Sequence, residues 1–369
     1  MTKRPLISIL IPTRERVGTL RYAIASALDQ NFDDYEVVVS DNVSNDGTRE
    51  LVESFASRGV KYAAPPSRVS MNDNFECALE ASSGKYVIFI GDDDAIVPGA
   101  IAKIAALIAS KQPRVIAWKC ARYFWPMAGR PARACPVPKH EERKMDLARS
   151  AKLSARLGGA GGHRLVSPYH SCVERAVLDE IKAKVGRVFA TPMPDIFLIY
   201  AIPPIAPTAI LTSFIATVSG VSARSNSAVE HLERRYTEFE AESKEYIVHH
   251  SLYPGWSATT LMLADCLLVA VDAFPQFYTP GIATNEAVLA YLCTQPIPGD
   301  ESLDSFGVLK RRKEIRKRAP LNIARFAAWR SVHQLLRARR ILVRDNWREE
   351  RLTTVVNAHD YAKMVAANQ

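Results

Sequence analysis

The first hundred residues alternate short runs rich in β-branched residues with amphipathic helical segments, and this alternation constrains the fold more than any other feature. Such a pattern is typical of βαβ units, which build a mostly parallel sheet covered by helices. The expected strands and helices end in turn signals such as Asn45-Asp46-Gly47 and Ser83-Gly84. The pattern predicts strands over 6–11, 35–40, 61–63 and 86–90, with helices over 18–28, 51–55 and 72–81 between them.

The length of 369 residues is too great for one average core and favours about two domains, at roughly 150 residues each. A hydrophobic fraction of 48% with 24% charged residues is typical of a folded globular chain. After residue 225 the pattern turns helical, over 229–249, 258–274 and 285–292. We therefore predict an α/β domain over 1–225 and a mainly α-helical C-terminal region over 226–369.

A charge-free stretch over 196–223 is long enough to span a membrane. Pro203, Pro204 and Pro207 would break such a helix in its middle, because proline removes a backbone donor and clashes with the preceding turn. The residues from 209 to 218 are rich in β-formers. The stretch is therefore predicted to be a buried helix, turn and strand.

The formal net charge of +9 is concentrated near the C-terminus, where 310–351 holds 15 Lys and Arg against 4 Asp and Glu. Apolar residues are interleaved with these charges at helical spacing, including Phe326, Trp329 and Trp347. Two interpretations stay open: a helix that lies on an anionic membrane surface, or one that packs on its own domain with a solvated basic face. Nucleic acid is disfavoured as a partner, since no recognised nucleic-acid module accompanies the charge.

The six cysteines lie far apart without a C-x-x-C pair, a pattern that favours neither a zinc site nor a disulfide framework. The apolar run at 6–11 is too short for a signal peptide and stops at Pro12. We expect a cytoplasmic protein, with the basic segment as a means of peripheral attachment to the inner face of the membrane.

Polar residues follow three of the predicted strands, and the carboxyl ends of parallel strands share one edge of the sheet, where ligands bind. Three consecutive aspartates at the end of the apolar strand 86–90 are costly unless a cation neutralises them. Mg²⁺ or Mn²⁺ would do so and would also bridge to the phosphates of a nucleotide. The alternative is a solvated acidic turn before a helix. The residues expected to converge are Thr13, Arg14 and Glu15, Asp41 and Asn42, and Asp92, Asp93 and Asp94.

The sequence resembles the family-2 glycosyltransferases of the GT-A fold over about residues 5 to 105. Four segments carry the resemblance in the right order and spacing: 7–14, 36–48, 74–78 and 81–94. The resemblance weakens to about residue 225 and is absent beyond. It implies a nucleotide-diphosphate sugar as donor, a divalent metal as cofactor, and a saccharide or lipid-linked hydroxyl acceptor, in the synthesis of surface polysaccharide or glycolipid.

The resemblance also assigns roles to individual residues. Asp195, at the start of a predicted helix, occupies the place of the catalytic base, with a plain helix cap as the alternative. Relatives often carry a second acid at two positions that hold Ser40 and Pro194 here. Glu174 and Asp179 are the next acids in line for the base. Nucleotide-sugar contacts are expected from Pro12, Thr13, Arg14, Glu15, Asp41, Asn74, Asp92 and Asp93, and metal ligation from Asp94 and Asp92.

Three further features attract weaker expectations. His170 is either a contact to acceptor or phosphate or, more often for such a residue, structural. The loop Gly158–Gly162 is expected to be a mobile lid and not a phosphate-binding loop, because it lacks the Lys-Ser/Thr of a P-loop. Arg224 is either a pyrophosphate contact or simply exposed.

The sequence as a whole predicts an inverting glycosyltransferase. One alternative is a sugar-phosphate nucleotidyltransferase, which would need a glycine-rich basic loop after the first strand, where only Gly18 is found. Another is a protein that binds a nucleotide sugar or an anionic partner without turnover, against which the intact aspartates argue.

Overall fold

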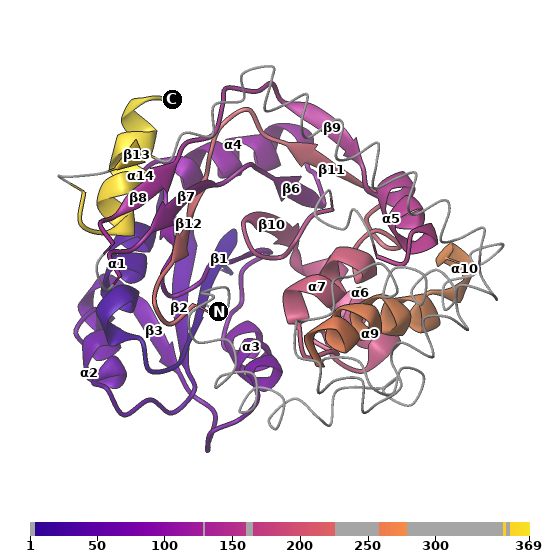
Figure 1. Cartoon of the computed structure of the whole chain (residues 1–369), viewed down its shortest axis with the longest axis horizontal. Coiled ribbons are helices and arrows are strands. Elements are labelled where there is room, and N and C mark those ends of the chain that lie inside the picture. Colours follow the sequence, from indigo (N-terminus) through magenta and orange to yellow (C-terminus); the bar gives the residue numbers. More distant parts are fainter. Residues whose placement is uncertain (1–3, 128–129, 160–164, 226–257, 279–349, 352–354) are drawn as a thin grey trace, which may run out of the picture.

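The computed structural model describes residues 4–127, 130–159, 165–225, 258–278, 350–351 and 355–369 (Figure 1). The predicted helices over 229–249 and 285–292 lie outside these residues. So do most of the basic segment and all but the first two residues of the glycine loop. Among the described helices, none is both long enough and apolar enough to cross a membrane.

The larger sheet of the described chain has eight strands in the order β3-β2-β1-β4-β10-β6-β11-β9. Its first four strands are parallel, and β10 runs antiparallel between β4 and β6. β11 is parallel to β6, and β9 closes the edge antiparallel to β11. In this order the strands are β3 (Val60–Ala63), β2 (Tyr35–Asp41), β1 (Ile7–Thr13), β4 (Tyr86–Phe89), β10 (Ser171–Glu174), β6 (Val115–Ala117), β11 (Thr208–Leu211) and β9 (Arg143–Asp146).

A second sheet of five strands in the described residues packs near the carboxyl ends of β1 and β4, in the order β13-β8-β7-β12-β5. β12 is parallel to β7 and antiparallel to β5, and β5 follows β4 in the chain after the five residues 90–94. This sheet therefore brings residues from 217 onward beside the aspartates. Its strands are β13 (Glu350–Arg351), β8 (Arg133–Cys135), β7 (Ala121–Phe124), β12 (Thr217–Val221) and β5 (Ala95–Ile96).

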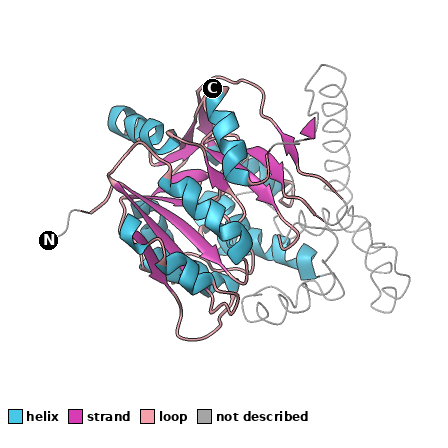
Figure 2. Cartoon of the chain, turned by 90° about the vertical axis from the view of Figure 1, so that its left-hand side faces the viewer, coloured by secondary structure: helices cyan, strands magenta, loops and turns pink. Residues whose placement is uncertain are grey.

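Helices cover both faces of the larger sheet (Figure 2). Because side chains alternate along a strand, Leu10 packs with α3, α6, α7 and α9, whereas Ile9 and Ile11 pack with α1, α4 and α14. The described helices are α1 (Val17–Leu28), α2 (Thr48–Glu53), the 3₁₀ helix η1 (Ala56–Arg58), α3 (Met71–Glu80), α4 (Ala100–Lys111), α5 (Leu147–Arg156), α6 (Arg175–Val185), α7 (Pro194–Ala201), α9 (Ala258–Ala273), α10 (Pro275–Tyr278) and α14 (Ala358–Ala367).

Two described parts of the C-terminal region pack on the α/β domain. α9 lies against α7, and α14 lies against α1, β5 and β12 (Figure 1). The side chain of Gln369 exchanges two hydrogen bonds with the backbone of Ile215, at 3.1 and 3.0 Å. The boundary at residue 225 stays a prediction, and these contacts tie segments on either side of it together.

The predicted α/β class is confirmed, and the strands and helices of the first hundred residues lie within two residues of their predicted bounds in most cases. The charge-free stretch 196–223 is a buried helix, turn and strand, as predicted, and it also supplies β12. One strand was not predicted: β8 lies in the proline-rich segment 126–138 and pairs there with β7.

Glu36 joins β2 to its neighbours and to the turn that enters β4. Its Oε1 accepts hydrogen bonds from the Ser8 hydroxyl at 2.6 Å and from the N–H groups of Ser83 and Gly84 at 2.6 and 3.1 Å. Its Oε2 lies 2.5 Å from Lys61 Nζ. Burial alone would raise the pKa of Glu36, but these hydrogen bonds outweigh burial and lower it to about 2.

We predict that Glu36→Gln lowers the free energy of unfolding by about 2 kcal/mol at pH 7, since a shift of one pKa unit corresponds to about 1.4 kcal/mol and Lys61 is partly solvated. A lowered carboxyl pKa stabilises the fold above its unfolded value of about 4.3, and that contribution is lost as the pH falls toward 2. Urea unfolding should therefore show a difference in the free energy of unfolding between the wild type and Glu36→Gln that becomes smaller below about pH 4.

Glu53→Gln serves as the control, because Glu53 forms an exposed pair with Arg49 one helical turn away and such pairs contribute little. Its unfolding midpoint should stay at the wild-type value. A pH-independent difference for Glu36→Gln would contradict the charged role of Glu36.

Candidate active site

The three aspartates follow β4 at the carboxyl edge of the parallel strands, as predicted. A tight turn holds them: the Gly91 N–H donates to Asp94 Oδ2 at 2.6 Å, and the Asp94 N–H donates to the Gly91 carbonyl at 3.2 Å. All three aspartates are at least 94% buried, so each carboxylate needs partners that replace water.

The partners of the Asp92 carboxylate come from β1 and from the loop that follows β1. Its Oδ2 accepts a hydrogen bond from the Thr13 hydroxyl at 2.7 Å, and its Oδ1 forms an ion pair with Arg16 Nη1 at 2.9 Å. Burial raises the pKa of Asp92, and the Arg16 charge opposes that effect. Asp92 is therefore already paired with a cation supplied by the protein.

Asp93 is held by the segment that follows β12. Its Oδ2 accepts hydrogen bonds from the Ser222 hydroxyl at 2.7 Å and from the Ser225 hydroxyl. Its backbone carbonyl accepts one from Trp125 Nε1 at 2.9 Å. These contacts join the aspartate turn to the second sheet.

Asp94 accepts backbone N–H groups from both sheets, from Gly91 at Oδ2 and from Gly220 at Oδ1, the latter at 2.7 Å. No cation of the described residues contacts it, and the nearest ring nitrogen is His170 Nε2, 3.7 Å from Oδ2. Burial and the neighbouring charge of Asp93 raise the pKa of Asp94 to about 8. A carboxyl group with this pKa is a place where a bound cation would be favourable.

His170 lies beside Asp94 in a left-handed backbone conformation, with φ of 58°. Its Nδ1 is 2.8 Å from the Thr217 hydroxyl, which also accepts a hydrogen bond from Trp118 Nε1 at 2.7 Å. Burial lowers the pKa of His170 to about 4, so the ring is neutral at pH 7. A non-glycine residue in this backbone region is uncommon and is often found at functional sites.

Tyr169 connects the aspartate turn to Asp195. Burial raises the pKa of Tyr169 well above its usual value, and the charges of Asp195, Asp94 and Asp92 raise it further. The Tyr169 hydroxyl thus lies within electrostatic range of all three carboxylates and stays protonated. Tyr169 is therefore near the aspartate turn and within electrostatic range of Asp195.

Asp195 is the second residue of α7, which begins at Pro194. Proline at that position and an acid in the first turn both favour a helix start. Burial raises the pKa of Asp195, and the Ile196 N–H, which donates to the carboxylate, opposes that effect. Asp195 as a whole residue is half-buried.

The loop before Asp195 is fixed from two sides. Asn72 at the start of α3 donates to the carbonyls of Phe189, at 3.0 Å, and Thr191. On the other side the Thr191 hydroxyl lies 3.0 Å from Cys266 Sγ on α9. The C-terminal region therefore takes part in positioning the loop.

The candidate nucleotide contacts lie at the ends of β1 and β2. Asp41 is fully buried and accepts hydrogen bonds from the Ser44 hydroxyl at 2.5 Å and the Tyr62 hydroxyl at 3.1 Å. Asn74 donates to the carbonyls of Ser40 and Thr13, at 3.1 and 3.4 Å. It thereby joins the ends of both strands.

The remaining predicted contacts belong to the start of the loop after β1. Pro12 is buried within β1, and Arg14 is partly exposed. Glu15 has a φ of 55°, and its Oε1 accepts the Asn45 N–H at 2.9 Å. Arg224 is exposed and donates to the Glu15 carbonyl, so it lies at this loop.

A divalent cation fits Asp94 better than Asp92. Each Asp94 oxygen accepts one N–H and keeps a free lone pair, whereas Asp92 already contacts Arg16. No group of three metal-binding side chains converges within the described residues. The donor set suits Mg²⁺ or Mn²⁺, which can bind through one or two carboxylates and complete the shell with water and phosphate oxygens.

Sequence reasoning missed several residues of the site. Arg16 stands in the charged run after β1, which was the only available signal. Tyr169, Ser222, Ser225 and Gly220 come from distant strands and carry no local motif.

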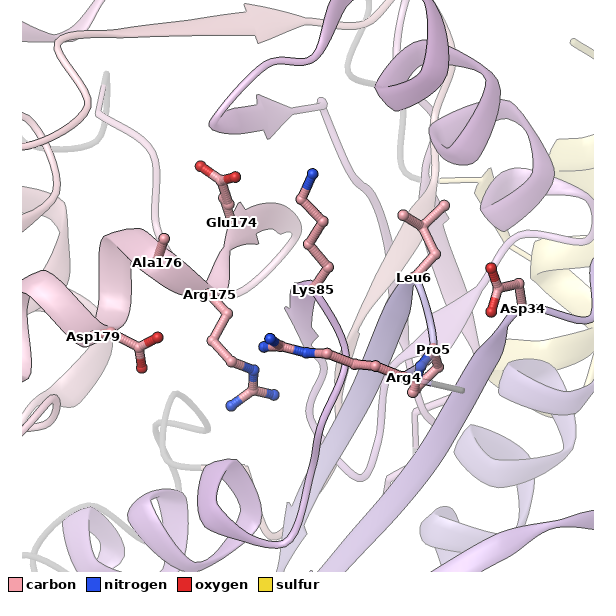
Figure 3. Close-up of a pocket in the computed structure, with 9 residues that line it drawn as sticks. All are labelled: Arg4, Pro5, Leu6, Asp34, Lys85, Glu174, Arg175, Ala176 and Asp179. Atoms are coloured by element: carbon pink, nitrogen blue, oxygen red, sulfur yellow. The ribbon is translucent and has the colours of Figure 1, made fainter. Parts of the chain in front are cut away.

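The opposite edge of the larger sheet carries a pocket of about 400 Å³ that shares no lining residue with this site (Figure 3). Glu174 and Asp179, the acids next in line for the base, both line it. Glu174 also pairs with Arg114 at 3.1 Å. Both acids therefore lie away from the aspartate turn.

Comparisons with known proteins agree with the predicted resemblance. Residues 8–160 match the model of glycosyl transferase family 2. Over 103 residues the chain is 33% identical to GalNAc(5)-diNAcBac-PP-undecaprenol beta-1,3-glucosyltransferase of Campylobacter jejuni, covering 27% of this chain and 33% of that protein. Over 89 residues it is 29% identical to UDP-Glc:alpha-D-GlcNAc-diphosphoundecaprenol beta-1,3-glucosyltransferase WfgD of Escherichia coli, covering 24% and 35%. The chain thus spans about a third of these relatives' length.

Two solved structures are similar at low identity. TarS of S. aureus in complex with UDP-GlcNAc has a TM-score of 0.49 and 18% identity, over 88% of this chain and 91% of that one. The mannosyltransferase PcManGT of Pyrobaculum calidifontis, in complex with GDP-Man and Mn²⁺, has a TM-score of 0.44 and 17% identity, over 87% and 85%.

We predict that Gly220→Ala disrupts the aspartate turn. A Cβ atom there would lie 1.8 Å from the Asp93 carbonyl oxygen, so the two sheets must move apart. The free energy of unfolding should fall by about 1 to 3 kcal/mol or more, as for other overpacked sites, and nucleotide affinity should fall with it. Thermal melting and UDP titration would measure both effects.

Gly18→Ala is the control, because a Cβ at Gly18 meets nothing within 4 Å. It lies in a helix, where alanine is favoured over glycine by roughly 0.5 to 1 kcal/mol. Wild-type stability in Gly220→Ala would show that the close approach of the sheets does not constrain the site.

Proposed function

We propose that this chain, which carries a glycosyl transferase family 2 domain over residues 8–160, transfers a sugar from a nucleotide-diphosphate donor to a hydroxyl acceptor with inversion. The observation that carries the proposal is the buried aspartate turn at the carboxyl end of β4, beside which Tyr169 bridges to Phe89. The charge of Asp195 contributes to the raised pKa of Tyr169, which supports a position of the candidate base near this turn. A direct displacement needs the base and the binding site of the leaving group to lie close together, on either side of the reacting carbon.

In the proposed reaction the acceptor oxygen attacks the anomeric carbon while Asp195 takes the hydroxyl proton. The bond from the anomeric carbon to the diphosphate oxygen breaks, and the nucleoside diphosphate leaves with the bonding electrons. One displacement inverts the configuration. The raised pKa of Asp195 makes it a stronger base than an exposed aspartate.

The roles of the other carboxylates follow from their partners. Asp94 is the first choice as metal ligand and Asp92 the second, because Arg16 already neutralises Asp92. A bound Mn²⁺ or Mg²⁺ would supply charge stabilisation for the departing diphosphate. We assign the nucleotide to the ends of β1 and β2, with Asp41 toward the base and Thr13, Asp92 and Asp93 toward the ribose.

The names of the two relatives suggest the substrates to test first. Both act on sugars linked to undecaprenyl diphosphate, and one uses UDP-Glc. We therefore propose a lipid-linked saccharide acceptor in surface polysaccharide or glycolipid synthesis, with UDP-glucose as the first donor to test. Attachment to an anionic membrane through the basic segment 310–351 is also part of the proposal. Residues 310–349 of this segment lie outside the described residues.

We predict that Asp195→Asn lowers the transfer rate about 10² to 10⁴-fold, the usual contribution of a general base, while UDP affinity stays at the wild-type level. The amide keeps the shape of the carboxylate and cannot take the proton. Because burial raises the pKa of Asp195, wild-type turnover should fall on the acid side at a pH above the ordinary aspartate value of about 3.9. That limb should be missing from the residual activity of the variant.

Asp179→Asn is the matched control, because Asp179 lies at the opposite edge of the sheet. It should keep full activity and the wild-type pH profile. Transfer by Asp195→Asn at the wild-type rate would exclude Asp195 as the base.

We predict that Asp94→Asn removes the Mn²⁺-dependent part of UDP binding, since it replaces the carboxylate that lacks a protein cation. Asp41→Asn should weaken UDP binding both with Mn²⁺ and with EDTA, because Asp41 faces the nucleotide and not the metal. Calorimetric titration of UDP under both conditions separates the two effects. Equal UDP affinity of the wild type with Mn²⁺ and with EDTA would rule out the metal site.

A further inference from the structure

The side chain of His170 ends a short chain of hydrogen bonds that fixes which ring nitrogen carries the proton. Trp118 Nε1 can only donate, and it donates to the Thr217 hydroxyl at 2.7 Å. The hydroxyl hydrogen of Thr217 must then find another acceptor. His170 Nδ1, 2.8 Å away, is the acceptor that the structure offers among the described residues. Nδ1 is therefore the bare nitrogen, and the proton sits on Nε2.

The opposite tautomer would be costly. If Nδ1 carried the proton, Thr217 would accept two hydrogen bonds and its own hydrogen would lack an acceptor in a side chain that is 1% exposed. A buried donor without a partner costs about 1 to 3 kcal/mol. A difference of this size favours the Nε2–H form about fivefold or more.

The Nε2–H group lies beside Asp94 and has no hydrogen-bond acceptor among the described residues. Its separation of 3.7 Å from Asp94 Oδ2 is too long for a direct hydrogen bond, so a ligand atom that contacted both groups would satisfy them. The pair offers one donor and one acceptor. A hydroxyl group matches both, since it can accept from Nε2–H and donate to the carboxylate. A phosphate oxygen can accept from the ring but has no proton to donate to Asp94.

We propose that His170 is a substrate-contacting residue whose Nε2–H, together with Asp94, binds a hydroxyl group of the donor sugar. This assignment rests on the proposed function, because it takes the ligand at Asp94 to be a nucleotide sugar. In this tautomer Nε2 has no lone pair, so the ring is not a metal ligand. The left-handed backbone at His170 turns the side chain toward Thr217 and Asp94, which accounts for a strained residue at this position.

The tautomer can be measured without any ligand. Two-bond ¹H–¹⁵N correlation spectra of the ¹⁵N-labelled full chain should show a protonated Nε2 and a bare Nδ1 for one histidine, identified by its loss in His170→Gln. Thr217→Val, which removes the hydroxyl at nearly the same volume, should change that pattern. A protonated Nδ1 in the wild type would contradict the hydrogen-bond chain from Trp118 through Thr217 to His170, and with it the proposal.

The sugar contact is tested by binding of UDP-glucose and UDP to three variants of His170. Glutamine can place its amide N–H near the position of Nε2, whereas asparagine reaches only the position of Nδ1. Asparagine tolerates a left-handed backbone better than glutamine does. If His170 has a purely structural role, His170→Asn should bind UDP-glucose more tightly than His170→Gln. If His170 has the proposed role, His170→Gln should bind UDP-glucose more tightly than His170→Asn.

We expect His170→Ala and His170→Asn to lose UDP-glucose affinity about tenfold, the size of one hydrogen bond, with UDP affinity unchanged and His170→Gln close to the wild type. Equal losses for UDP and UDP-glucose, or a better result for asparagine than for glutamine, would overturn the sugar contact. If the wild type binds UDP and not UDP-glucose, a set of nucleotide sugars is compared by thermal shift. The one that raises the melting temperature most is then used in place of UDP-glucose in the binding test. Failure to bind any nucleotide sugar removes the proposed function and the sugar contact with it, while the tautomer is decided by the spectra alone.

Discussion

The buried carboxylates at the end of β4 are the interaction on which the rest of the site depends. Burying charged oxygens is tolerated only when hydrogen-bond donors replace water. Here the donors come from both sheets, with Thr13 and Gly91 from the larger one and Gly220 and Ser222 from the segment of β12. The need to satisfy the aspartates therefore holds the second sheet against the first. The close approach of Gly220 to the Asp93 carbonyl follows from the same need.

The three neighbouring aspartates differ in function because their partners differ. Asp92 has a cation, Asp93 has hydroxyl groups, and Asp94 has only backbone N–H groups. Like charges this close resist joint ionisation, and burial raises the pKa of both Asp92 and Asp94, the latter to about 8. The turn thus presents one poorly compensated carboxylate to the ligand, and sequence position alone does not distinguish it from its neighbours.

The sequence could predict the α/β class, the edge of the sheet and the aspartate turn, because these depend on local periodicity and on the rule that ligands bind beyond parallel strand ends. It could not predict the partners of the aspartates. Ser222 lies more than a hundred residues from Asp93 in the sequence. Nothing in Ser222-Ala223-Arg224-Ser225 indicates that its hydroxyl groups donate hydrogen bonds to a carboxylate. Arg16 was visible as a charge and not as the partner of Asp92. The short β8 was missed because three paired residues in a proline-rich segment leave no periodic signal.

The C-terminal region is also more closely tied to the site than its divergent sequence indicated. Cys266 on α9 contacts Thr191, and Asn72 on α3 holds the same loop from the other side. Asp195 follows four residues later, so its position depends on one contact from α3 and one from α9, which lies beyond residue 225. A base must stand within hydrogen-bond distance of the acceptor hydroxyl. If Asp195 is the base as proposed, changes on α9 can move it relative to the aspartate turn, which would give the C-terminal region a physical route to influence which acceptor is used.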